Sequence, residues 1–187
     1  DTVQRLINPI GVVYTTISQE HTQVAGIKNP FEDYYKAKTL LSQGMQKGAI
    51  VTNCDDPRTA LIGLNKESDV KVNYYGIETD VIEYIGDNSI KCPKCGEMLD
   101  YSHFYLNHRG IYTCKCGFKR PEANVKLTDV EFSSTSWNLT IEGDLFNYTS
   151  SKNVKFNLKL NVPPFGFHNI YNTLASITAY ATFTPKH

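Results

Sequence analysis

The sequence has no excess charge of either sign and no long hydrophobic run. Its 187 residues include 19 basic and 19 acidic side chains, so no overall field attracts the chain to nucleic acid or to anionic lipid. No apolar run approaches the roughly 20 residues that a transmembrane helix needs, and no basic and apolar signal segment opens the chain. We therefore expect a cytoplasmic protein with no transmembrane segment and no nucleic-acid partner.

The cysteine content argues against a disulfide framework and favours a metal site. The chain has five cysteines, an odd number. Four of them fall in one short segment as two close pairs, Cys92 with Cys95 and Cys114 with Cys116. Thiolates on such turns can converge on tetrahedral zinc, and a fully ligated site is structural rather than catalytic. We predict a zinc ribbon over residues 87–123 in a reducing compartment, in which His103 or His108 could replace one thiol.

The ribbon segment is locally basic, which raises a second interpretation. Tyr105 and Tyr112 could stack on bases beside the neighbouring lysines. We favour a core role for these aromatic residues, because a small metal-nucleated unit needs them to cover itself, and we interpret the lysines as solvated. A non-enzymatic zinc-ribbon binding module remains the alternative to an enzyme.

The first part of the chain alternates strands and helices. Strands are predicted at 10–16, 48–52 and 70–77, and helices at 31–45 and 57–64. This order predicts an α/β fold, with a mostly parallel sheet flanked by helices and right-handed crossovers. Asp55 or Asp56 is expected to cap the second helix, and catalysis is the less favoured role for these acids.

The last part of the chain predicts an antiparallel β extension and a helix. Alternating apolar residues indicate a meander over 124–160 with Trp137 packed beneath it. A helical stripe covers 169–182, for which Asn169 is a candidate cap. The chain is thereby divided into a first α/β part, the inserted ribbon and a remainder, at 1–86, 87–123 and 124–187.

Candidate functional residues follow the first predicted strand. Glu20 and His21 fall in the loop after it, and open α/β sheets bind ligands beyond the carboxyl ends of their strands. Lys36 and Lys38 follow on different faces of the next predicted helix.

Four stretches, in this order, resemble the later portion of the central domain of the Mur ligase family: VVYTTISQEH, YYKAK, VTNCDDP and GFHNIYNTLASITAY. The ribbon segments CPKCGEML and CGFKRPE are similar to the corresponding segments of MurT-like ligases. These ligases are the subunits that work with a glutaminase to amidate a cell-wall lipid precursor. The YYKAK element looks more like the amino-acid-adding ligases. An archaeal pseudomurein peptide ligase combines both features and is our first choice, ahead of a folate-adding ligase, which would leave the ribbon unexplained.

The resemblance implies a chemistry and a set of site residues. Members of this family use ATP to form an acyl phosphate on a nucleotide- or lipid-linked peptide, which an amino acid or ammonia then attacks. The implied catalytic residues are His21, as a ligand of a magnesium ion that bridges the phosphates, and Lys38, as a carbamylated lysine that holds a second magnesium ion. Asn169 and Asn172 match the asparagines that lie against the adenine of ATP, with His168 beside them.

Two features depart from the family pattern. Glu20 stands where aspartate is frequent, and no G-x-x-x-x-G-K-[ST] phosphate loop occurs in the sequence. We expect the missing loop to precede Asp1, a further domain to follow His187, and the fragment alone to be unable to hydrolyse ATP.

Overall fold

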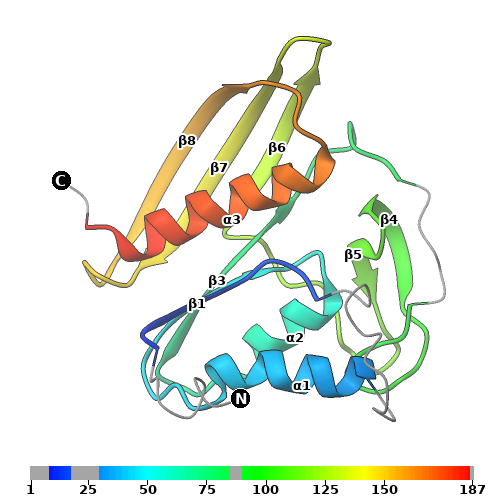
Figure 1. Cartoon of the computed structure of the whole chain (residues 1–187), viewed down its shortest axis with the longest axis vertical. Coiled ribbons are helices and arrows are strands. Elements are labelled where there is room, and N and C mark those ends of the chain that lie inside the picture. Colours follow the sequence, from blue (N-terminus) through cyan, green and yellow to red (C-terminus); the bar gives the residue numbers. More distant parts are fainter. Residues whose placement is uncertain (1–8, 18–29, 85–89, 186–187) are drawn as a thin grey trace.

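The computed structural model describes residues 9–17, 30–84 and 90–185, which form three helices and eight strands (Figure 1). The first half contains β1 (Gly11–Tyr14), α1 (Pro30–Gln43), β2 (Gly48–Asn53), α2 (Pro57–Leu64) and β3 (Val70–Ile77). The second half contains β4 (Asp100–Leu106), β5 (Arg109–Thr113), β6 (Val125–Phe132), β7 (Trp137–Asn147), β8 (Lys152–Val162) and α3 (Phe167–Phe183).

Six of these strands form one mixed sheet in the order β1-β2-β3-β6-β7-β8. β1, β2, β3 and β6 are parallel neighbours, and β6, β7 and β8 pair antiparallel. Every residue of β2 is buried, as expected for a parallel strand covered on both faces. In β8 only alternate residues are shielded, so the antiparallel part has one solvated face. The predicted α/β fold with an antiparallel extension is confirmed.

Helices cover both faces of the parallel part of the sheet (Figure 1). α3 packs on one face, where Leu174 contacts a core that includes Val51 and Leu127. α1 and α2 cover the other face, where Ile50 and Ile62 belong to a second core. Consecutive residues of β2 thus face opposite layers, which is the strand periodicity of two.

α3 begins two residues earlier than the sequence pattern predicts. Gly166 is its N-cap, with a φ of 82° that favours glycine, and no side chain caps the helix. Asn169 therefore lies inside the first turn, where its amide donates to the carbonyl oxygen of Phe165. The prediction that Asn169 caps α3 is wrong, because Gly166 already turns the chain into the helix.

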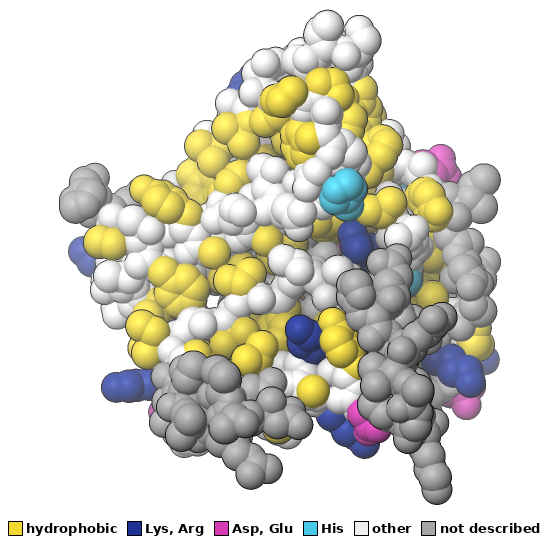
Figure 2. Space-filling model, viewed as in Figure 1, with side chains coloured by type: hydrophobic (Ala, Val, Ile, Leu, Met, Phe, Trp, Pro, Cys, Tyr) yellow, Lys and Arg dark blue, Asp and Glu magenta, His cyan; other side chains and the backbone are white. Residues whose placement is uncertain are grey.

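α3 contains no Asp, Glu, Lys or Arg. The face that carries it is dominated by hydrophobic and uncharged side chains (Figure 2). Trp137 is half-buried and packs against the main core, as predicted. It lies beside the start of α3, in ring contact with Phe132, Phe165 and Phe167.

The predicted ribbon contains the β4–β5 hairpin and packs against α2. Tyr112 and Phe118 form a third core with Leu61 of α2. Tyr105 is only 3% exposed and Tyr112 only 1%, which confirms that these rings are core residues. The division of the chain at residues 87 and 123 stays a prediction. Within the described ranges, no helix is long and apolar enough to cross a membrane.

Candidate functional site

The four ribbon cysteines lie together in space. Their Sγ atoms are all within 4.8 Å of one another. The Sγ atoms of Cys92 and Cys116 are 3.8 Å apart, and those of Cys95 and Cys114 are 3.6 Å apart. Four thiolates about 2.3 Å from a tetrahedral zinc ion would be separated by about 3.8 Å. The cluster therefore has the ligand type and the spacing of a closed metal site.

Neither ribbon histidine belongs to this cluster. His103 places its Nε2 atom 2.7 Å from the carbonyl oxygen of Ile82, and His108 places its Nε2 atom 3.2 Å from an Asp56 carboxylate oxygen. The alternative in which a histidine replaces one of the thiols is wrong, because both rings have partners elsewhere.

Asp56 caps α2, as predicted, and also contacts two other segments. One carboxylate oxygen accepts the backbone N–H of Arg58 at 3.0 Å. The other accepts the hydroxyl of Thr16 at 3.0 Å and the N–H of Ile17 at 3.1 Å, and it faces His108. Burial alone would raise the pKa of Asp56, but His108 and these hydrogen bonds lower it overall. Asp56 thus stays charged and fixes the chain that leaves β1.

Asp55 does not cap a helix; it forms a buried ion pair. Its Oδ1 atom is 2.7 Å from Nε of Arg120, which also contacts Glu78 at 3.3 Å. Its Oδ2 atom accepts the N–H of Ile77 and the hydroxyl of Tyr171, both at 2.9 Å. Burial opposes the charge on Arg120, but Asp55 raises the pKa of that guanidinium above its ordinary value. The result is a fixed connection between the sheet, the ribbon and α3.

These contacts place the ribbon on the carboxyl edge of the parallel sheet. Besides the Arg120 ion pair, the hydroxyl of Tyr112 donates to the carbonyl oxygen of Cys54 at 3.0 Å. The backbone N–H of Gly110 donates to the carbonyl oxygen of Asp55, also at 3.0 Å. The close approach requires glycine at position 76, since a Cβ there would lie 2.6 Å from Oδ1 of Asp55. The ribbon therefore lies where open α/β sheets bind ligands.

The residues predicted as magnesium ligands are only partly covered by the structure. His21 lies outside the described residues, as does Glu20. Lys38 is half-buried on α1, with Nζ 5.2 Å from the centre of the Tyr34 ring. Its backbone oxygen accepts the hydroxyl of Tyr14, the last residue of β1, at 3.1 Å. Whether His21 and Lys38 meet stays a prediction.

The residues predicted to contact adenine lie on the first turns of α3. His168 and Asn172 are exposed and Asn169 is half-buried. The Asn172 amide donates to the Asn169 side-chain oxygen at 2.9 Å. Tyr171 is buried and donates to Asp55, so the start of this helix and the carboxyl edge lie together. Their role toward a nucleotide stays a prediction.

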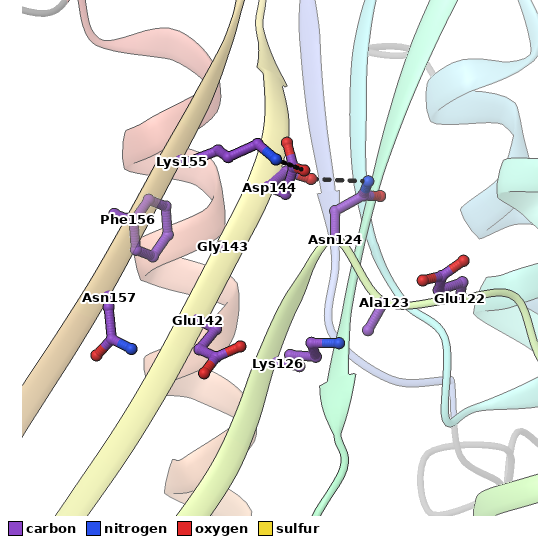
Figure 3. A pocket seen from close by; sticks show the side chains of 10 residues that line it. All are labelled: Glu122, Ala123, Asn124, Lys126, Glu142, Gly143, Asp144, Lys155, Phe156 and Asn157. Atoms are coloured by element: carbon purple, nitrogen blue, oxygen red, sulfur yellow. Dashed lines mark hydrogen bonds and ion pairs between the residues drawn. The ribbon is translucent and has the colours of Figure 1, made fainter.

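A surface hollow of about 670 Å³ lies away from this edge, beside β6, β7 and β8 (Figure 3). Its two lysines already have partners: Lys155 pairs with Asp144 at 3.0 Å, and Lys126 pairs with Glu78 at 3.2 Å. We do not assign the site to this hollow, because it contains none of the residues gathered at the carboxyl edge.

Sequence reasoning missed several residues of the site. Asp55 and Asp56 follow the buried strand β2 as a pair. Their position at the end of that strand was the signal in the sequence that they could belong to a site. Nothing local marked Arg109, Arg120 or Tyr171, because their partners come from other segments of the chain.

The depressed pKa of Asp56 predicts a pH dependence of stability. Asp56 has an unfolded-state pKa of about 3.9, and its lower folded-state pKa contributes stability that is present above this value. As the pH falls from about 4 toward the lower folded-state pKa, this contribution should be lost progressively, so that part of the loss is visible by pH 3. Urea unfolding between pH 3 and 7 should show this loss in the full-length protein but not in the Asp56→Asn variant. Equal pH dependence in both, with exposed Asp144→Asn as the control, would contradict the assignment.

Comparisons with known proteins agree with this architecture. The model of the Mur ligase middle domain matches residues 1–113. The MurT subunit of lipid II isoglutaminyl synthase (glutamine-hydrolyzing) from Staphylococcus aureus, strains COL and N315, is 28% identical over 145 residues, which are 76% of this chain and 28% of the relative.

A solved structure of a pseudomurein peptide ligase type C from Methanothermus fervidus is similar over 96% of this chain and 35% of that chain, with a TM-score of 0.64 and 30% identity. The chain thus spans about a third or less of the length of these relatives. Because the family model covers more than half of the residues, the chain belongs to the Mur ligase family of ATP-dependent, amide-bond-forming ligases.

Proposed function

We propose that the protein carrying this chain is an ATP-dependent peptide ligase of cell-wall precursor synthesis that works through an acyl phosphate and adds an amino acid to a nucleotide-linked peptide. The main support is the 30% identity with a pseudomurein peptide ligase over nearly the whole chain, ribbon included. Such a ligase would act in the cytoplasm, where its nucleotide-linked substrate is made.

We assign a structural zinc ion to Cys92, Cys95, Cys114 and Cys116. The sulfur separations fit tetrahedral coordination, and in this arrangement no ligand position is left for a substrate. Zinc would therefore hold the ribbon on the sheet edge rather than take part in the ligation.

The nucleotide would be bound by residues from three segments. Magnesium ions would neutralise the phosphates of ATP during transfer, with His21 as one ligand. Lys38 fits a metal site only after carbamylation, because its ammonium group would repel a cation. His168, Asn169 and Asn172 would hold the adenine at the start of α3.

Replacing Lys38 by arginine should lower kcat by about 100-fold or more, because arginine keeps a positive charge but cannot provide the carboxylate that binds magnesium. The measurement is ADP release by the full-length enzyme with its peptide acceptor. Lys36→Arg is a matched control on the same helix, at an exposed position, and should keep wild-type turnover. A Lys38→Arg enzyme with unchanged kcat would remove Lys38 from the site.

A second candidate function is the ligase subunit of a glutamine-dependent amidating enzyme. The observation in its favour is the 28% identity with MurT over 76% of this chain. ADP release should be measured in full-length protein with free amino acids, with ammonium, and with glutamine plus a glutaminase partner. Turnover with a free amino acid supports the first proposal, and dependence on ammonia or the glutaminase supports the second. Failure with every amine would contradict both.

A further inference from the structure

Arg109 is a buried cation without a counter-ion in the described part of the chain. It is 8% exposed, and its Nε atom is buried with no acceptor there. Its guanidinium lies over the ring of Tyr171, 4.8 Å from the ring centre, and one terminal nitrogen contacts the hydroxyl of Thr16 at 3.4 Å. A buried guanidinium normally has a carboxylate or phosphate partner, because an unpaired buried charge is costly.

The nearby carboxylates are already used. Asp55 is held by Arg120, Ile77 and Tyr171. Asp56 accepts hydrogen bonds from three groups and faces His108. No described acid lies within ion-pair distance of Arg109, so its charge has no counter-ion among the residues that the structure describes.

The position of Arg109 indicates what the missing anion is. It is the first residue of β5, and it contacts both the chain that leaves β1 and the second turn of α3, through Thr16 and Tyr171. The planar guanidinium fork suits two oxygens of one phosphate or carboxylate. Contact with the ring of Tyr171 helps to hold the guanidinium in place.

We propose that Arg109 binds a phosphoryl group at the carboxyl edge of the sheet. This inference rests on the proposed ligase function, and it gives the inserted ribbon a direct part in that site. The phosphoryl group has two possible sources with the same chemistry: the terminal phosphates of the nucleotide, or the acyl phosphate formed on the peptide substrate.

The test compares the full-length wild-type protein with the Arg109→Met variant, which keeps the side-chain bulk and loses the charge. Titration calorimetry would measure the Kd values of tripolyphosphate and of a non-hydrolysable ATP analogue, and ADP release would give kcat and KM. If the nucleotide is the source, both Kd values should rise about 10- to 100-fold. If the acyl phosphate is the source, both Kd values stay constant and kcat falls by a similar factor.

Arg58→Met is the matched control. Arg58 is on α2, and its guanidinium also lies over an aromatic ring, 4.2 Å from the centre of the Phe31 ring. It should leave Kd and kcat within about twofold of wild type. Unchanged Kd and kcat in Arg109→Met would overturn the proposal. If that variant loses zinc or unfolds early, Arg109→Lys replaces it. The loss of the guanidinium fork should still raise Kd or lower kcat by about threefold to tenfold.

The binding measurement also separates this inference from the ligase proposal. A wild-type protein that binds tripolyphosphate through Arg109 but forms no amide bond with any amine would contradict the proposed function alone. Ligation that proceeds normally in Arg109→Met would contradict the Arg109 site alone.

Discussion

Replacing Cys92 by serine in the full-length protein should release the zinc ion and increase amide hydrogen exchange across Asp100–Thr113 by about 100-fold or more, equivalent to roughly 3 kcal/mol of lost local stability. Cys92 is the buried member of the cluster, 2% exposed, and it packs in the small core with Leu61 and Tyr112. Structural zinc sites contribute about 10–16 kcal/mol of apparent binding energy. Without this binding energy, the small core around Leu61 and Tyr112 would not keep the β4–β5 hairpin folded.

The same variant should impair ligation, because the ribbon supplies groups to the sheet edge. His108 and Arg109 reach that edge from the segment between the two cysteine pairs, and Arg120 reaches it from just after the second pair. The measurements are zinc content, hydrogen exchange by mass spectrometry, and ADP release. Cys54→Ala removes the cysteine outside the cluster and should keep one zinc ion per chain. A Cys92→Ser protein with full zinc content and a protected hairpin would show that the cluster is not a metal site.

The second large effect is expected for Asp55→Ala, which should lower the free energy of unfolding by about 3–5 kcal/mol. Asp55 is fully buried, and its removal leaves the Arg120 guanidinium, with a side chain only 9% exposed, without its main partner. The N–H of Ile77 and the hydroxyl of Tyr171 lose their acceptor as well. Burial and Asp55 raise the pKa of Tyr171, so its hydroxyl stays a donor.

A surface ion pair provides the control for this prediction. Asp144→Ala breaks the pair with Lys155, whose side chain is 79% exposed, and should cost about 1 kcal/mol or less. In the double variant Asp55→Ala with Arg120→Met, part of the loss should be recovered because the unpaired charge is gone. Chemical denaturation of the full-length protein measures all three. If Asp55→Ala cost no more than Asp144→Ala, the buried pair would have no structural role.

Most of the fold could be predicted from local patterns. The helix over 57–64 and the strand over 70–77 agree with α2 and β3, because Pro57 follows an acidic cap and the strand alternates. β1 is shorter than the predicted 10–16. Its last predicted residue, Thr16, bonds to Asp56 instead of continuing the ladder, and such a tertiary contact leaves no trace in a hydrophobic pattern.

The candidate site was predictable only in part. The two cysteine pairs carry their own spacing signal, and the four Sγ atoms do converge. Asp55 and Asp56 were read mainly as caps, since Asp is a frequent N-cap residue, but only Asp56 caps the helix. Arg109 could not be found, since its environment comes from β1 and α3, which are distant in the sequence.

The ribbon also occupies the connection between two adjacent parallel strands. β3 and β6 pair in the sheet, with Tyr75 opposite Val125, and the whole cysteine segment lies between them where a crossover helix is usual. A metal ion bound by Cys92 and Cys116 would shorten this connection to its flanking residues, which would lower the entropy cost of bringing the two strands together. Metal binding by the four cysteines would in this way favour the pairing of β3 with β6.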